Sequence, residues 1–257
     1  MIQLFSRYKG NYKSIFIVPI GDVHFGSKCF NRKYLDNALR FIDRNRNRCR
    51  IFLMGDLLEL ATKTSVGRSV YDESYPTQKQ FEVAVETFKP YADLIDVIVE
   101  GNHEERIIRD TSFEITQEFA HRIGRYDAYG KFNAIVNIQV GDLMYSSYVW
   151  HGATSGTKET SAVNGMLSMR EKAFCHMYFM GHTHKLFDLP REIAVPTTCG
   201  NEVVKMKQLL VNTGSALDDG GYGDQKGLAY TRKGFCAVQI FAEQRKMVFH
   251  YIDDLVA

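Results

Sequence analysis

Paired cysteines, a strong net charge and long hydrophobic runs are all lacking in this sequence. The five cysteines are odd in number and widely spaced, and no two of them form a Cys-x-x-Cys pair. A disulfide framework or a cysteine-based zinc site is therefore not expected. The formal net charge of +2 is too small to indicate a polyanionic partner by itself.

The chain also lacks a candidate membrane segment. The longest apolar stretch near its start, Ile15–Ile20, is far too short to cross a bilayer, and no charged segment followed by a long apolar run precedes it. We therefore expect a reduced, cytoplasmic protein without membrane association. The five prolines are dispersed and no low-complexity stretch occurs, which argues against disorder beyond the ends.

Buried-strand patterns alternate with helical patterns in the first half of the chain. Continuous apolar runs predict buried strands at Ile15–Ile20 and Ile51–Met54, and a third buried strand is expected at Ile95–Val99. Apolar residues at helical spacing predict helices over residues 32–46, 77–93 and 113–123. This alternation is typical of an α/β fold with a mostly parallel sheet and helices on its faces.

The second half has an α+β character with mainly antiparallel pairing. Gly141-Asp142 is a two-residue hairpin signal between the strands expected at Ala134–Val140 and Leu143–Trp150. The other elements expected here are a helix at Ala162–Phe174 and strands at Met177–Met180, Leu209–Asn212, Phe235–Phe241 and Met247–Ile252. No linker or repeat interrupts the chain, so we expect one domain over residues 1–257.

Polar residues typical of metal sites follow the ends of these strands. They lie in the motifs Gly21-Asp22-Val23-His24, Gly55-Asp56, Gly101-Asn102-His103-Glu104, Trp150-His151-Gly152 and Gly181-His182-Thr183-His184. In α/β sheets, ligand sites lie outside the carboxyl ends of the strands. If these segments are extended, residues i and i+2 point the same way, so Asp22 with His24 and His182 with His184 can each aim at one point.

The types of ligand narrow the choice of metal. Mixed carboxylate and imidazole ligands suit manganese, iron or zinc better than magnesium or calcium, which prefer oxygen ligands. Each motif alone is weak, because a single Asp-x-His or Gly-Asp is more often a structural turn. The ordered set of five is much harder to attribute to chance.

As an ordered set, these motifs resemble those of the calcineurin-like metallophosphoesterase superfamily over residues 21–184. The resemblance implies a four-layer sandwich of two mixed β-sheets flanked by helices. It implies two divalent metal ions, manganese first, with iron, zinc, nickel or magnesium as alternatives. One metal would be held by Asp22, His24 and His184, the other by Asn102, His151 and His182, with Asp56 bridging both.

The resemblance also suggests a reaction. Two adjacent metals can supply a hydroxide at neutral pH that attacks phosphorus in line. His103 would stand beside the metals without binding them, as a general acid or a donor to the phosphate. Glu104 would either orient His103 through a hydrogen bond, without touching a metal, or serve as a carboxylate at a helix start.

Differences from the motifs of two phosphatase and hydrolase groups argue against their substrates. Glu59 and Glu100 stand where Ser/Thr protein phosphatases carry Asp and Arg, and lipid-A precursor hydrolases usually lack the counterpart of His103. We expect a phosphodiesterase acting on a nucleotide or nucleic acid, of the phage-type or repair-nuclease-like group. The alternatives are a broad-specificity phosphomonoesterase and a non-catalytic scaffold.

Several basic residues near the motifs are candidates for substrate binding. These are Lys63, Arg68, Arg106 and Lys158. A separate basic run extends from Arg40 to Arg50. It is interpreted either as the solvated end of a helix or as a nucleic-acid contact.

Overall fold

The computed structural model describes residues 1–8, 12–62, 73–153, 156, 158–197, 200, 202–219 and 231–256. Within these ranges, the strands form two six-stranded mixed sheets. Sheet 1 contains, in spatial order, β12 (Met247–Tyr251), β11 (Cys236–Phe241), β2 (Ser14–Ile20), β3 (Cys49–Leu53), β4 (Ile95–Val99) and β5 (Tyr129–Lys131). Sheet 2 contains β1 (Ile2–Tyr8), β6 (Asn133–Val140), β7 (Leu143–Trp150), β8 (Met177–Met180), β10 (Val203–Thr213) and β9 (Leu186–Pro196).

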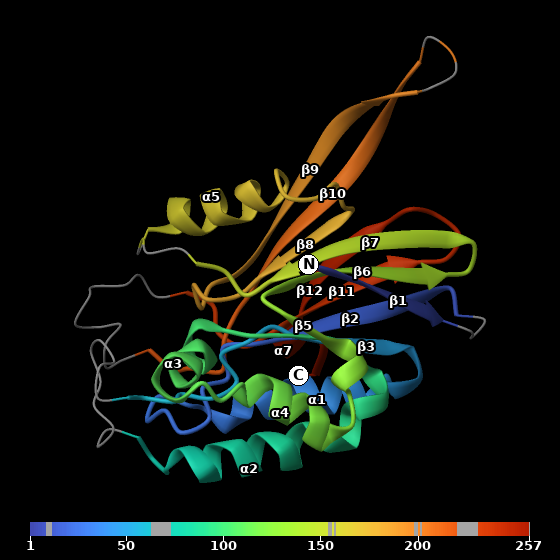
Figure 1. The fold of residues 1–257 in the computed structure, drawn as a ribbon. Helices are drawn as coiled ribbons and strands as arrows, with labels where there is room; N and C mark the ends of the chain where they lie inside the picture. The colour runs from blue at the N-terminus through green and yellow to red at the C-terminus, as the bar shows by residue number, and fades with distance from the viewer. Residues whose placement is uncertain are drawn as a thin grey trace.

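Helices cover the outer faces of both sheets (Figure 1). The α-helices are α1 (Arg32–Arg44), α2 (Thr77–Phe88), α3 (Asn102–Thr111), α4 (Ile115–Ile123), α5 (Glu159–Met169) and α7 (Ile252–Val256). Three 3₁₀ turns, η1 (Arg46–Arg48), η3 (Lys89–Leu94) and η4 (Tyr126–Ala128), complete the elements described. No helix among the described residues is both long and apolar enough to span a membrane.

Three apolar clusters separate four layers. Alternate residues of β2 point to opposite faces, so Ile15 and Ile17 enter the core between the sheets whereas Phe16 and Val18 pack under the helices. The third cluster joins α5 to the outer face of sheet 2, where Met166 is fully buried. The expected four-layer architecture of two mixed sheets between helices is confirmed.

The parallel order β2–β3–β4 brings the first-half motifs to one edge of sheet 1. β2 pairs with β3 and β3 with β4, both in parallel. In sheet 2, β7 and β8 are also parallel neighbours. Their carboxyl ends meet those of sheet 1, so all five strand-end motifs converge.

Some elements differ from the sequence predictions. Strands β1 and β9 and helix α3 were not predicted, and β1 and the outer part of β9 are largely exposed. The helix expected over residues 77–93 ends at Phe88 and continues as η3, because Pro90 has no N–H to donate within an α-helix. The helix expected at 162–174 instead spans Glu159–Met169.

Candidate metal centre

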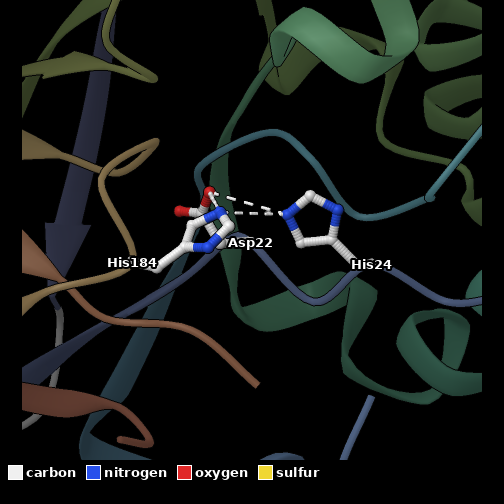
Figure 2. A group of neighbouring side chains, drawn as sticks. All are labelled: Asp22, His24 and His184. Carbon is white, nitrogen blue, oxygen red and sulfur yellow. Dashed lines mark hydrogen bonds and ion pairs between the residues drawn. The ribbon is translucent and has the colours of Figure 1, made fainter. Parts of the chain in front are cut away.

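The residues expected to hold one metal lie together. The Nε2 atoms of His24 and His184 are 3.2 Å apart, and His184 Nε2 lies 3.2 Å from Asp22 Oδ1. Figure 2 shows these three side chains pointing toward a common centre. Their ligand atoms all lie within 4.8 Å of one another, which is a spacing that one divalent ion can span.

The residues expected to hold the other metal form a second group. Asn102 Oδ1 lies 3.2 Å from His151 Nε2 and 2.7 Å from His182 Nδ1. Asp56 Oδ2 is 3.2 Å from His151 Nε2 and 3.8 Å from His24 Nε2. Asp56 therefore stands between the two groups, in the position of a bridging carboxylate.

The backbone at the site is not extended, contrary to the reasoning from strand periodicity. Asp22, His24, Asp56, His182 and His184 all have positive φ, between 48° and 67°. Asp22 and His24 still meet, but they do so from left-handed turns. His182 and His184 point to different groups, so the expectation that this pair aims at one point is wrong.

Two motif glycines are required by close packing around the carboxylates. A Cβ on Gly101 would collide with Asp56 Oδ1, and a Cβ on Gly181 would lie 2.5 Å from Asp22 Oδ2. Asp22 in turn accepts hydrogen bonds from the backbone N–H of His182 at 2.9 and 3.1 Å. These contacts fix both carboxylates in the site.

Electrostatics at the site couple buried carboxylates to imidazoles. Burial alone would raise the pKa of Asp56, but His151, His103 and His24 outweigh it and hold that pKa well below its usual value. Burial alone would lower the pKa of His151, but Asp56 and Asp22 raise it to about 10. Buried anions and nitrogen donors facing common points are the donor chemistry that divalent cations require, and the residues present fit such ions.

Glu104 connects two of the loops that carry ligands. Its carboxylate accepts hydrogen bonds from the backbone N–H groups of Asp56, Leu57, Leu58 and Gly101, at 2.8–3.2 Å. Burial raises its pKa to about 7, with the nearby Asp56 charge acting in the same direction. These bonds go to backbone groups rather than to His103. Glu104 lies in the first turn of α3 and accepts from the N–H of the N-cap residue Gly101, so the expectation of a carboxylate at a helix start is confirmed, and the same side chain orients the candidate ligand loops.

Glu59 contacts the candidate ligand His24, which the sequence did not predict. Its Oε2 lies 3.1 Å from His24 Nδ1, on the side of the ring opposite the candidate metal. A carboxylate there fixes the tautomer and orientation of a metal-binding histidine. The sequence showed only that Glu replaces the more usual Asp at this motif position. It did not predict which group the longer Glu59 side chain would contact.

His103 lies beside the two groups and contacts Arg106. Its Nδ1 is 2.5 Å from the carbonyl oxygen of Glu59, and its Nε2 is 2.9 Å from Arg106 Nη2. We assign the proton to Nδ1, which donates to the carbonyl, so that Nε2 accepts from the guanidinium. Burial lowers the pKa of His103 to about 4, although Asp56 opposes the shift.

Of the four basic residues predicted to bind substrate, the structure places one at the site. Arg106 is at the site through its contact with His103, whereas Lys158 is exposed just before α5. Lys63 and Arg68 lie outside the described residues.

Most arginines of the basic run make contacts within the protein. Arg46 Nη2 is 2.6 Å from Asp93 Oδ1, and Arg50 forms an ion pair with Asp96. The Arg48 guanidinium lies 4.8 Å from the centre of the Phe16 ring. These contacts hold the connection between α1 and β3 against the rest of sheet 1.

The sequence matches no protein-family model and no curated protein. Among solved structures, it is similar to proteins described as phosphoesterases and to Vps29 proteins. They include a protein described as a predicted phosphoesterase from Streptococcus pneumoniae (13% identity, TM-score 0.42, 94% of this chain and 92% of that one). They also include the calcineurin-like phosphoesterase YfkN from Bacillus subtilis (11%, 0.43, 95% and 92%) and zinc-complexed Vps29 from Entamoeba histolytica (13%, 0.38, 92% and 97%).

Proposed function

We propose that this protein is a phosphoester hydrolase that uses two divalent metal ions, with manganese as the first candidate. One observation carries the proposal. Seven candidate ligands from five strand ends form two groups, and Asp56 lies between them. A bound metal pair would supply Lewis acidity and a water of lowered pKa.

The protein residues divide the remaining work. Asp22, His24 and His184 would hold one ion and Asn102, His151 and His182 the other. These are the sets that the sequence motifs imply, and they are the sets whose ligand atoms lie together here. Asp22, His24 and His151 are buried, and their low exposure to water strengthens the electrostatic contacts among them.

His103 and Arg106 would act on the phosphate. His103 is neutral in this environment, because burial and the neighbouring cation disfavour its charged form. A bound phosphate would bring negative charge to the ring and favour protonation again. His103 could then give a proton to the leaving oxygen, while Arg106 binds a non-bridging oxygen.

As the substrate we propose a phosphodiester of a nucleotide or nucleic acid. Support comes from the departures at Glu59 and Glu100 from the protein-phosphatase motifs and from the complete ligand set, which a pure scaffold would not need. Hydrolysis of bis-p-nitrophenyl phosphate and p-nitrophenyl phosphate, side by side with Mn²⁺, Mg²⁺, Zn²⁺ or no metal, tests the proposal. Faster metal-dependent turnover of the diester supports it, preference for the monoester identifies a phosphomonoesterase, and metal binding without any turnover favours a scaffold.

A further inference from the structure

A cavity of about 470 Å³ adjoins the second ligand group. Asn102, His151 and His182 form part of its wall, so a phosphate held at that group borders the cavity directly. The hydrolysis mechanism uses none of the other residues that line it. The cavity is large enough for a group the size of a nucleoside, since small-molecule pockets begin at about 300 Å³.

Two aromatic side chains line this cavity. Trp150 immediately precedes the candidate ligand His151 and pairs across the sheet with Asn133, which follows Phe132 in the chain. Phe132 is 54% exposed, and the Lys131 ammonium lies 5.3 Å from the centre of its ring. Aromatic side chains beside a phosphate site are the usual platforms for stacking a nucleobase.

The polar residues of the cavity favour a hydrogen-bond donor over a second anion. Glu100 is buried, its Oε1 accepts from the Tyr129 hydroxyl, and its Oε2 has no hydrogen-bond partner among the residues the structure describes. Glu105 forms an ion pair with Arg109 at 2.7 Å, so that pair is internally neutralised. A buried carboxylate oxygen is stabilised by a donor such as a sugar hydroxyl or a base amino group, whereas a second phosphate would be repelled.

We propose that this cavity binds the nucleoside attached to the scissile phosphate, with its base against Phe132 and Trp150. This inference rests on the proposed phosphoesterase function and specifies its substrate. It assigns Phe132 to specificity, since the side chain contacts the base and not the reacting atoms.

Trp150 makes the test direct, because it is the only tryptophan in the sequence. Its fluorescence is recorded while adenosine 5′-monophosphate or ribose 5-phosphate is added, first with EDTA and then with Mg²⁺. The two ligands carry the same phosphate and differ in the base. We expect saturable quenching by the nucleotide and none by the sugar phosphate.

Matched variants separate stacking from a general effect. Phe132→Ala should weaken nucleotide binding about tenfold, as loss of a stacking platform does. Phe174→Ala is the control, since Phe174 is similarly exposed (61%) and does not line the cavity. Equal quenching by both ligands, no quenching with or without Mg²⁺, or unchanged affinity in Phe132→Ala would overturn the proposal.

The subsite and the proposed function can fail separately. Metal-dependent cleavage of p-nitrophenyl diesters without quenching by the nucleotide would leave the hydrolase in place and remove the nucleoside subsite. Quenching that depends on the base and on Phe132, without any cleavage, would keep the subsite and remove the hydrolase.

Discussion

Five candidate metal ligands have a backbone conformation that residues with side chains seldom adopt. Each such residue costs of order 1–3 kcal/mol and persists only where its surroundings enforce it. At Asp22 the enforcing contacts include its N–H bond to the Gly55 carbonyl and its carboxylate bonds to His182. Asp22 is therefore held in place by contacts with other protein groups.

The Asp56 carboxylate has the most demanding position, because it faces both ligand groups. We expect Asp56→Asn to lower metal-dependent turnover by more than about 100-fold, since even the loss of outer contacts to ligands costs about 10- to 100-fold. Steady-state hydrolysis of bis-p-nitrophenyl phosphate measures this. Asp43→Asn, on the exposed end of α1, is the control and should retain full activity.

His103 should be separable from metal binding. His103→Ala is expected to cut turnover by about 10²- to 10⁴-fold, the usual range for a proton-transfer group, with both metals retained. Metal content by elemental analysis and kcat on the diester are the two measurements. If the variant loses metal instead, His103 is a ligand and its assignment to proton transfer fails.

At this scale, the sequence predicted which residues assemble but not how. The strand-end motifs identified the seven candidate ligands that the structure brings together. Extended geometry was the wrong reason for Asp22 and His24, because left-handed φ values arise from tertiary packing that no single-chain periodicity reveals. The contact between the Glu59 carboxylate and His24 could not be predicted from the sequence either, because it depends on the conformation of a long side chain.

Among the elements, the exits of β3 and β4 depend on one side chain. Glu104 accepts four backbone N–H bonds from these two loops. Glu104→Gln replaces one acceptor with a donor that faces N–H groups, and we expect a loss of about 2–3 kcal/mol in the free energy of unfolding. Urea denaturation measures it, and Glu105→Gln, a less buried neighbour, should change stability by less than about 0.5 kcal/mol. Equal losses in both variants would argue against this function for Glu104.

The junction between β7 and β8 predicts a pH effect away from the site. His176 Nδ1 accepts from the Ser146 N–H at 3.1 Å, and its Nε2 is 2.7 Å from Arg245. Burial, together with the Arg245 charge, lowers the pKa of His176 to about 4, from 6.5. Between these pH values His176 is protonated in the unfolded chain but remains neutral in the folded protein. The free energy of unfolding therefore falls as pH drops from about 6.5 to 4.

The His176→Asn variant tests this origin, since an amide oxygen can still accept from Ser146. We expect its stability to fall less than that of the unmodified protein over the same pH interval. Thermal denaturation at pH 7, 6, 5 and 4 compares the two proteins. Parallel curves would assign the acid sensitivity to other groups.

Element prediction was clearest where burial was complete. Strands β2, β3 and β4 are mostly apolar and almost fully buried, so their patterns were clear. β1 and the outer part of β9 are mostly exposed, and α3 presents mainly charged residues, with Glu104 as its buried residue. β1 is set by pairing with the distant strand β6, which local patterns do not encode, whereas β9 forms a hairpin with β10.

For the whole molecule, candidate ligands drawn from both sheets would make metal binding a cross-link between them. Ions that bind only the folded state stabilise it by about 2.7 kcal/mol at 100 times their Kd. For a protein of this size we expect Mn²⁺ to raise Tm by roughly 5–10 °C relative to EDTA. Differential scanning calorimetry measures the shift, which should largely disappear in His151→Ala and persist in His121→Ala, whose residue is exposed on α4.

The position of β2 has a consequence for how the chain is made. This strand carries the first ligand motif, yet one of its edges pairs with β11, whose residues Cys236–Phe241 are synthesised far later. During translation, β2, β3 and β4 can associate while that apolar edge remains open to other chains. A growing polypeptide therefore has its candidate metal ligands available before its sheet is closed. We expect its yield in a cell to depend on chaperones that shield this edge until β11 is synthesised.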